Sequence, residues 1–400
     1  REVFFSRGFK EEKTNAAGVC VINTCTVTSA ADQKSLAAVR RALRENPGAK
    51  VVVTGCLAEF DAQRIREINN RLIIVKNAQK RYICDILSSG RFSRGKKITA
   101  KKYRVLKEPG ITFFNGHTRA FLKIQDGCDN FCAYCKVPFV RGSVRSKPLP
   151  DIVKEANALV KHGFKEIVLS GICLGSYGRE LNDKISLVDV ISKLEEIDGL
   201  LRIRLSSIEA MDISDELIDK MSVSDKLCPH LHIPLQSGDD EILRKMNRRY
   251  TGSFYKKLIV RIKKKVRNVS ITTDCLVGFP GEKEENFLNT LRLIKEIMPL
   301  KTHVFPYSAR ECTRAAADFK AMAIRPEIIR RRVKMLDALA RDCADNFKKK
   351  FSRIYLPVLF ESSLGGKGNL WEGYTNNYIK VRFKSKNPLR NKLIVLRPLP

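Results

Sequence analysis

Hydrophobic and polar positions alternate between two periods in the first hundred residues. Short β-branched runs indicate strands, and the segments between them carry apolar residues at helical spacing. Asn46-Pro47-Gly48 marks the end of the first helix. Strands that alternate with helices predict a small parallel α/β domain over residues 1–100. The expected elements, strand and helix in turn, are 19–23, 30–45, 50–54, 61–69 and 71–76.

The alternation stops over residues 101–118, which are rich in Lys and Gly, and a linker is expected there. It restarts at Arg119 and continues to about residue 345, with six strand-like runs separated by amphipathic helices. A closed barrel of this kind needs eight β/α units. Six units predict an open, partial parallel barrel whose site lies at the carboxyl ends of the strands. The expected strands are 120–125, 166–170, 201–206, 231–235, 269–277 and 301–305.

The last stretch changes character again. A long helix is expected from Arg325-Pro326 to about Lys350, and after it come short strand-like runs separated by Gly, Asn and Pro. These runs predict a small all-β barrel over residues 346–400. The fold class is therefore α/β with a terminal all-β domain.

Charge and composition restrict the class of partner. The chain of 400 residues has a formal net charge of +32, and 44% of its residues are hydrophobic, which suits a globular protein. No apolar run is long enough for a membrane span. The charge favours a polyanionic partner, with nucleic acid ahead of an anionic membrane surface and simple solubility as the plain alternative.

The C-terminal stretch concentrates this charge. From Asn346 onward there are 12 Lys/Arg against 2 Asp/Glu, with aromatic residues among them. Basic strands with exposed aromatics suit contact with an RNA backbone and stacking on its bases. The aromatic rings could equally form the core of a small domain. The candidate RNA-binding residues here are Tyr374, Tyr378, Lys380 and Arg382.

The 12 cysteines are too dilute for a disulfide scaffold, and no secretory signal is visible. A reducing, cytoplasmic location with cysteines used for metal or redox chemistry is expected. The chain opens at Arg1 without an initiator Met, and its first ten residues read as the end of a helix that is entered midway. We therefore expect a further N-terminal piece upstream.

One motif indicates the chemistry. The sequence DGCDNFCAYC places Cys128, Cys132 and Cys135 on one short loop directly after a strand. Three thiolates can hold three corners of a 4Fe-4S cluster and leave the fourth iron open to another ligand. Structural zinc usually takes four protein ligands, and no neighbouring pair completes such a set.

This loop resembles the signature of the radical S-adenosylmethionine (radical SAM) enzymes, and Tyr134 matches the aromatic residue common before the last cysteine. The resemblance implies a partial β/α barrel. It also implies that S-adenosylmethionine chelates the open iron and is cleaved to a deoxyadenosyl radical. Polar or glycine positions at successive strand ends then become candidate cofactor contacts, each with the plain alternative of a strand terminus. They are Gly171, Ser206, Ser207, Glu209, His232 and Gln236.

Two further cysteines sharpen the resemblance. Cys25 and Cys56 each come just after a strand, in the strings VINTCTVTSAADQKS and VVVTGC. These strings resemble the N-terminal domain of the methylthiotransferases, a radical SAM family in which three such cysteines hold an auxiliary 4Fe-4S cluster. The resemblance implies that Cys25 and Cys56 are the second and third ligands and that the first lies upstream of Arg1. Cys20 is the alternative, although it lies within a strand.

The resemblance covers nearly the whole chain, and the basic tail resembles the RNA-binding TRAM module. The strings KVPFVRGSVRS and GYTNNYIKV are most similar to the family branch that adds a methylthio group to carbon-2 of N6-threonylcarbamoyladenosine beside the tRNA anticodon. That branch implies tRNA as partner and an electron donor such as flavodoxin or ferredoxin, and it leaves the sulfur donor open. Arg141 and Arg145 are candidates for RNA phosphates, with solvated loop charge as the alternative.

Three other functions stay open. Two are methylthiotransferases, one acting on isopentenyladenosine in tRNA and one on an aspartate of a ribosomal protein. The third is a non-enzymatic RNA-binding metalloprotein.

Overall fold

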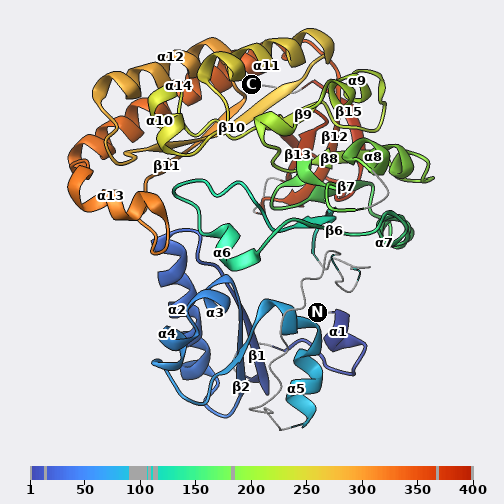
Figure 1. Cartoon of the computed structure of the whole chain (residues 1–400). Helices are drawn as coiled ribbons and strands as arrows, with labels where there is room; N and C mark the ends of the chain where they lie inside the picture. Colours follow the sequence, from blue (N-terminus) through green and yellow to red (C-terminus); the bar gives the residue numbers. More distant parts are fainter. Residues whose placement is uncertain are drawn as a thin grey trace.

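The computed structural model describes residues 2–12, 16–89, 106, 110, 116–181, 185–365 and 369–397. Most of the expected linker 101–118 lies outside these residues. Figure 1 shows an N-terminal α/β unit, a larger unit of strands flanked by helices, and a C-terminal sheet that lies against the larger unit. No helix in the described part of the chain is both long and apolar enough to cross a membrane.

The N-terminal unit is a three-stranded parallel sheet in the order β1-β2-β3. Valine and isoleucine side chains of the strands pack against the apolar sides of α2, α3 and α4. Thr28 caps α2, because its side chain accepts a hydrogen bond from the Ala31 N–H at 3.1 Å. The elements are α1 (Glu2–Phe5), β1 (Val19–Thr24), α2 (Ser29–Glu45), β2 (Lys50–Gly55), α3 (Cys56–Phe60), α4 (Ala62–Arg66), β3 (Ile73–Val75), a 3₁₀ helix (Asn77–Tyr82) and α5 (Ile83–Ser89).

The central unit contains the six parallel strands that the sequence predicts. They form two three-stranded sheets, β4-β7-β8 and β9-β10-β11, which are joined by single bridges at Ile203↔Leu227 and Ser207↔His232. In the described residues β4 and β11 are not paired, so the barrel is open. The strands are β4 (Arg119–Lys123), β7 (Glu166–Ser170), β8 (Arg202–Leu205), β9 (His230–His232), β10 (Ser270–Val277) and β11 (Lys301–Pro306), with a small ribbon of β5 (Gln125–Asp126) and β6 (Arg145–Ser146).

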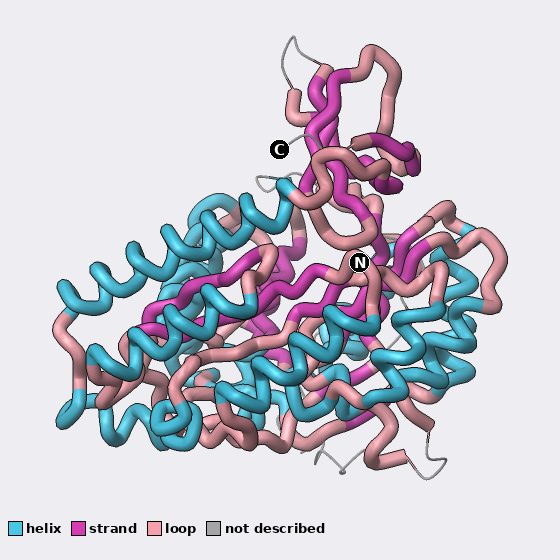
Figure 2. Tube along the Cα trace, turned by 90° about the horizontal axis from the view of Figure 1, so that it is seen from above, coloured by secondary structure: helices cyan, strands magenta, loops and turns pink. Residues whose placement is uncertain are grey.

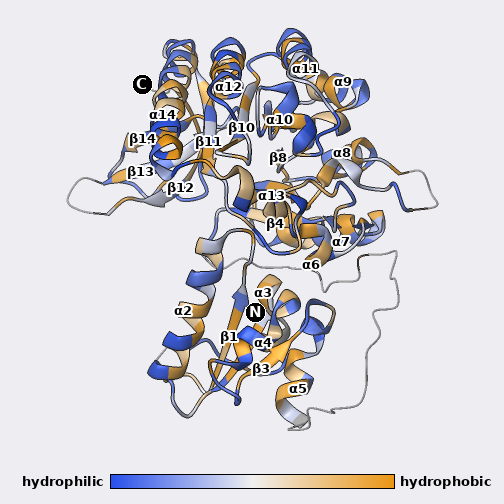
Figure 3. Ribbon diagram, turned by 60° about the vertical axis from the view of Figure 1, so that its left-hand side comes forward, coloured by the Kyte–Doolittle hydropathy of each residue, from blue (hydrophilic) through white to orange (hydrophobic). Residues whose placement is uncertain are grey.

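Amphipathic helices cover the outer side of this barrel, as the view from above shows (Figure 2). In α7, for example, Ile152, Ala156 and Leu159 repeat at helical spacing and are buried. Figure 3 shows the same two-sided hydropathy in the outer helices. The helices are α6 (Val137–Arg141), α7 (Leu149–Lys161), α8 (Leu187–Glu195), α9 (Asp215–Val223), α10 (Asp240–Lys245), α11 (Gly252–Lys265), α12 (Glu284–Ile297), α13 (Arg314–Met322) and α14 (Pro326–Lys349).

The C-terminal unit is a four-stranded antiparallel sheet in the order β14-β13-β12-β15. The sequence predicts a barrel here, and the described strands instead leave β14 and β15 as separate edges. Phe351, Val358, Phe360 and Val381 form its core. The strands are β12 (Leu356–Ser363), β13 (Leu370–Thr375), β14 (Lys380–Lys384) and β15 (Leu393–Leu396).

A buried charge network joins this sheet to the amino ends of the barrel strands. The Arg204 Nε donates to Glu166 at 2.6 Å, and the Arg204 guanidinium also donates to the carbonyls of Thr375 and Asn376 at 3.3 and 2.9 Å. Arg202 donates to the carbonyls of Tyr374 and Pro357. Burial raises the pKa of Glu166, but Arg204 and Arg202 lower it further, so its pKa lies below the ordinary value. One end of the barrel is therefore occupied, which leaves the carboxyl end for a site.

Candidate active site

The three-cysteine loop follows β4 and β5 at the carboxyl end of the barrel. Gly127 begins it with φ +78°, and a Cβ at this position would lie 1.9 Å from the Ser143 carbonyl oxygen. Only glycine fits so close an approach. The Cys128 N–H donates to the Gly142 carbonyl at 3.0 Å, and the Cys135 N–H donates to the Cys132 carbonyl at 3.0 Å. These two backbone bonds fix the two ends of the loop that carries the three cysteines.

The thiols of this loop are free and partly exposed. A hydrogen bond from Cys173 lowers the pKa of Cys128 to about 7, against the opposing effect of burial. Burial raises the pKa of Cys132, and it raises that of Cys135 to about 11, with a smaller increase in each from the neighbouring thiols. The Arg248 Nη1 lies 3.7 Å from the Cys132 Sγ and opposes this increase. Three free thiols on one loop beside a guanidinium are a donor set that fits a 4Fe-4S cluster with one open iron.

Residues after α10 hold the loop from the other side, and sequence reasoning missed them. The Ala133 N–H donates to the Met246 carbonyl at 2.9 Å. The Asn247 Nδ2 donates to the carbonyls of Asn130 and Phe131 at 3.2 and 3.0 Å. The only signal in the sequence is the polar string MNRRY after a helix, which is not specific.

Arg248 also organises the predicted cofactor position Glu209. Its Nη1 donates to both Glu209 carboxylate oxygens at 2.7 Å, and its side chain is buried. The Glu209 carboxylate is thus fixed beside the cysteine loop through Arg248. A cofactor amino or hydroxyl group would share this carboxylate with Arg248.

The other predicted cofactor positions lie at successive strand ends, as expected. A Cβ on Gly171 would lie 2.8 Å from the Gln125 Oε1, and that oxygen accepts the Cys173 N–H at 2.7 Å. Ser206 follows β8, and its buried hydroxyl has no hydrogen-bond partner in the described structure. An unpaired buried hydroxyl is costly and fits a site that receives a polar ligand.

The remaining three differ in their surroundings. Ser207 forms an isolated parallel β-bridge with His232. Gln236 forms another with Cys275, and its backbone has a positive φ of 67°. His232 pairs with Asp274 at 3.2 Å and so belongs to a polar cluster inside the barrel.

Tyr134 packs between the cysteine loop and the barrel. It lies against a cluster that contains Met246, Phe279 and Tyr307. Burial raises its pKa well above the ordinary value, so its hydroxyl stays protonated. Its role there is to pack the loop onto the barrel and to present a neutral hydroxyl.

Cys25 and Cys56 follow neighbouring parallel strands of the N-terminal sheet. Thr24 and Gly55 are register partners, so the next residues of β1 and β2 emerge side by side. Gly55 takes φ +100°, and a Cβ there would lie 2.2 Å from the Thr24 carbonyl oxygen, which explains the TGC string. Cys20 lies within β1 and packs against the domain core, where burial raises the pKa of its thiol.

Arg310 fixes the Cys25 loop to the barrel. This buried side chain follows β11, and its Nη2 donates to the Thr26 carbonyl and hydroxyl at 3.1 and 2.9 Å and to Asp32 at 2.5 Å. Its Nη1 donates to the Ser29 hydroxyl at 3.0 Å. We call this set of contacts between Arg310, Thr26, Ser29 and Asp32 the Arg310 clamp.

A second contact joins the Cys56 helix to the three-cysteine loop. Lys136, the residue after Cys135, places its Nζ 3.4 Å from the centre of the Phe60 ring on α3. Burial and Arg310 lower the pKa of Lys136. In Figure 1, α6 lies between the N-terminal sheet and the barrel. The Arg310 clamp and this contact place the two cysteine sets on opposite sides of one interface, which also encloses a cavity of about 200 Å³.

The four basic residues that were predicted to contact RNA differ in their ion pairs. Arg141 and Arg145 each lie 3.5 Å from Asp126, so both charges are partly compensated. Lys380 and Arg382 lie on β14 and pair with Glu372 at 2.8 and 3.4 Å while remaining exposed to solvent.

Tyr374 and Tyr378, which the sequence predicts to stack on RNA bases, have ring neighbours within the protein. Tyr378 is stacked on His230 with ring centres 4.5 Å apart and on Tyr374 at 5.0 Å, and the Arg204 guanidinium lies 4.8 Å from its ring. Both tyrosines therefore pack where the sheet meets the barrel, because their faces complete the buried charge network there. The exposed aromatics of this unit are Tyr355 and Phe383.

Comparison with known proteins agrees with this geometry. Residues 122–294 match the radical SAM superfamily, and residues 2–76 match the family described as Uncharacterized protein family UPF0004. TsrM, a radical S-adenosylmethionine methyltransferase from Kitasatospora setae, has a similar fold, with a TM-score of 0.57 at 14% identity over 74% of this chain and 65% of its own. The fold and the cysteine loop thus define a radical SAM protein.

The sequence relatives narrow the class. MtaB of Bacillus subtilis, a threonylcarbamoyladenosine tRNA methylthiotransferase, is 37% identical over 100% of this chain and 89% of its own length. MtaB of Aquifex aeolicus is 35% identical over 95% of this chain and 91% of its length. The tRNA-2-methylthio-N(6)-dimethylallyladenosine synthase of Clostridium tetani is 36% identical over 94% of this chain and 84% of its length. The chain belongs to the radical SAM methylthiotransferase family, and the resemblance seen in the sequence is confirmed.

Proposed function

We propose that this enzyme inserts a methylthio group at carbon-2 of N6-threonylcarbamoyladenosine beside the anticodon of a tRNA. The observation that carries the proposal is the interface between the two units, where Arg310 after β11 contacts the Cys25 loop and Lys136 beside Cys135 contacts the Cys56 helix. Sulfur insertion at an aromatic C–H needs a radical source and a sulfur source at one place. The choice of nucleoside is supported by relatives of that activity, which align over nearly all of this chain.

Two cofactor sites follow from the donor sets. Cys128, Cys132 and Cys135 would hold a 4Fe-4S cluster whose open iron takes S-adenosylmethionine, and Cys25 and Cys56, with a further cysteine, would hold the auxiliary cluster. When bound, these groups supply the radical and the sulfur, and the protein supplies binding and orientation. The unpaired hydroxyl of Ser206 would receive a polar group of the cofactor, together with Gly171, Ser207, Glu209 and Gln236.

The protein's own residues then have distinct tasks. Arg248 offsets negative charge at Cys132 and orients Glu209. The Arg310 clamp holds the segment after Cys25 against the loop that follows β11. The N-terminal unit would lie over the carboxyl end of the barrel and limit the access of water, which would protect a reactive intermediate.

The tRNA would contact the basic C-terminal sheet and the loop after Cys135. Lys380 and Arg382 on β14, and Arg141 and Arg145 near the cysteine loop, would approach phosphates. The target base must leave its stack to reach the barrel mouth, at a cost of a few kcal/mol. An electron donor such as flavodoxin or ferredoxin would supply electrons, and the site of action would be the cytoplasm, where tRNA is modified.

The proposal is tested with anaerobically reconstituted protein, S-adenosylmethionine, a reductant and purified tRNA. Three matched tRNA samples carry threonylcarbamoyladenosine, dimethylallyladenosine or plain adenosine beside the anticodon. Nucleoside mass spectrometry is expected to find the methylthio group on the first sample. Product on dimethylallyladenosine alone would favour the activity of the Clostridium tetani relative, and the absence of product on all three samples would refute a tRNA substrate.

A further inference from the structure

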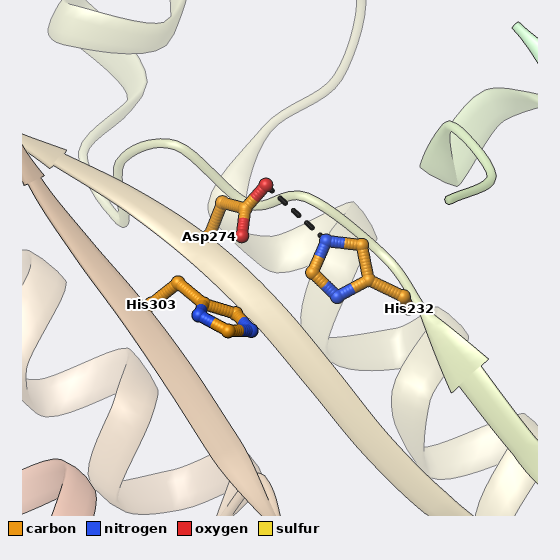
Figure 4. A group of neighbouring side chains, drawn as sticks. All are labelled: His232, Asp274 and His303. Carbon is orange, nitrogen blue, oxygen red and sulfur yellow. Dashed lines mark ion pairs between the residues drawn. The ribbon is translucent and has the colours of Figure 1, made fainter. Parts of the chain in front are cut away.

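A polar cluster lies across the three strands β9, β10 and β11, and we call His232, Asp274 and His303 the barrel triad. One side-chain atom of each lies within 4.8 Å of the others. Figure 4 shows the three side chains pointing toward one another from neighbouring strands. The strand register explains this, because His232 is level with Thr272 and His303 is level with Asp274.

The triad faces the inside of the barrel. Along β10, Ile271, Cys275 and Val277 pack into the core beneath the outer helices, so the alternate residue Asp274 faces inward. The triad side chains are only partly buried, in contrast to that core. The inside of the barrel is therefore open to solvent or ligand at this level.

The triad lies one step below the candidate active site. Leu276 is the next inward residue on β10, and it packs against the same hydrophobic cluster as Tyr134 of the three-cysteine loop. Two residues along a strand span roughly 7 Å. If a base is held at the level of the three-cysteine loop, a substituent that extends a few bonds from it would reach the triad.

Internal contacts hold part of the triad and leave part of it available. The His232 Nε2 contacts the Asp274 Oδ2 at 3.2 Å, and the His232 Nδ1 contacts the Thr272 hydroxyl at 2.9 Å. The His303 ring packs beside Phe305 and meets the edge of His232. No hydrogen bond to its nitrogens is found among the described residues, and burial together with Lys301 lowers its pKa.

The charges favour an organic polar ligand over a metal ion. Lys301 lies two residues from His303 on the same face of β11 and acts on it electrostatically. A divalent cation beside this lysine would have a single carboxylate to balance it. In addition, His232 and Asp274 already satisfy each other, whereas metal ligands must both aim at the ion.

We infer that the barrel triad recognises the N6 substituent of the target adenosine, with His303 as the specificity-determining residue. This rests on the proposed function. The threonylcarbamoyl group carries a carboxylate and a hydroxyl, whereas the dimethylallyl group of the other relatives' substrate is hydrocarbon. His303, with Lys301 nearby, suits the carboxylate, and the second carboxylate oxygen of Asp274, which has no hydrogen bond or ion pair among the described residues, suits the hydroxyl. A site built to hydrogen-bond a substrate rejects an analogue that lacks those groups.

The test compares methylthiolation of two tRNA samples, one with threonylcarbamoyladenosine and one with dimethylallyladenosine, by the wild type and by His303→Leu. The variant is expected to lose about tenfold or more in kcat/KM on the first tRNA, as for an unpaired polar group. Its activity on the second tRNA should not fall in parallel, so the ratio between the substrates shifts. Asp274→Asn, which keeps the side-chain volume, should shift the ratio in the same direction.

His162→Leu is the matched control, because it makes the same change at the exposed end of α7, outside the barrel. Iron and sulfide content must match in all variants. The inference would be overturned if His303→Leu left the ratio of kcat/KM on the two tRNA samples unchanged, including by an equal loss on both. It would also be overturned if the wild type bound Co²⁺ stoichiometrically and this variant did not. A wild type that acts only on dimethylallyladenosine would instead refute the proposed function.

Discussion

At the scale of single residues, functional residues that lie close together in the sequence could be predicted. Contacts between residues far apart in the sequence could not. Cys128, Cys132 and Cys135 stand within eight residues of one another, so their spacing alone indicates a shared ligand. Arg248 lies more than a hundred residues away in sequence and reaches Cys132 only through the fold. The same limit explains Tyr378, whose neighbours His230 and Arg204 come from the barrel.

Replacing one loop cysteine tests the first cluster. Cys132→Ala removes one of three thiolates and should abolish cleavage of S-adenosylmethionine, since the remaining two ligands cannot hold the cluster in place. Iron content and 5′-deoxyadenosine formation are the measurements. Cys312→Ala removes an exposed thiol outside the loop and is the control. Normal cleavage by Cys132→Ala would rule out the assignment.

At the scale of elements, the alternation of strands and helices could be predicted because it follows local periodicity. The six strands of the open barrel appear where the sequence places them, with β9 ending earlier than expected at His232. The Arg310 clamp was not predictable, because it joins the end of β11 to the start of α2 across some 280 positions. Packing between units depends on surfaces that carry no periodic signal of their own.

The Arg310 clamp should couple the two cysteine sets. Arg310→Gln keeps a polar side chain but leaves Asp32 buried with weaker compensation, and breaking a buried pair costs about 3–5 kcal/mol. We expect methylthiolation to fall at least about tenfold while S-adenosylmethionine cleavage continues, because a small displacement of a reacting group can cost that much or more. Product and 5′-deoxyadenosine are measured together.

Arg314→Gln is the matched control for that experiment, since it makes the same substitution at an exposed position four residues further on. A parallel loss of both products in Arg310→Gln would indicate a general folding defect. An unchanged ratio of methylthiolated product to 5′-deoxyadenosine would show that the clamp has no positioning role.

At the scale of the whole molecule, the C-terminal sheet is both a basic surface and the lid on the amino end of the barrel. The sequence predicts the first property from composition, but it does not indicate that Arg202 and Arg204 are buried beneath the sheet. Deleting the sheet would expose these charges, so surface substitutions are the sound test of RNA binding.

Glu166 should make the attachment of the sheet sensitive to acid. Its pKa is lowered in the folded protein, so its contribution is present above its ordinary pKa and is lost as the pH falls through the lowered value. Glu166→Gln should cost about 3–5 kcal/mol at neutral pH. Urea unfolding from pH 7 to pH 3 should show the difference between variant and wild type shrinking in acid. A constant difference would contradict this account.

The basic surface should bind tRNA through phosphates. The double variant Lys380→Gln with Arg382→Gln should weaken binding and reduce the salt slope by about one for each lost phosphate contact. Lys193→Gln, an exposed lysine on α8 in an ion pair with Glu196, is the control for a change of surface charge. Equal affinity and equal slope in the double variant would refute a role for β14.

The central claim is that the enzyme methylthiolates threonylcarbamoyladenosine in tRNA. The most direct measurement is mass spectrometry of tRNA nucleosides from cells that lack the gene, complemented either by the complete gene or by its Cys132→Ala form. The account predicts that 2-methylthio-N6-threonylcarbamoyladenosine is lost on deletion, returns with the complete gene and stays absent with Cys132→Ala. Full retention of this nucleoside in the deletion strain, or its return with Cys132→Ala, would contradict the account.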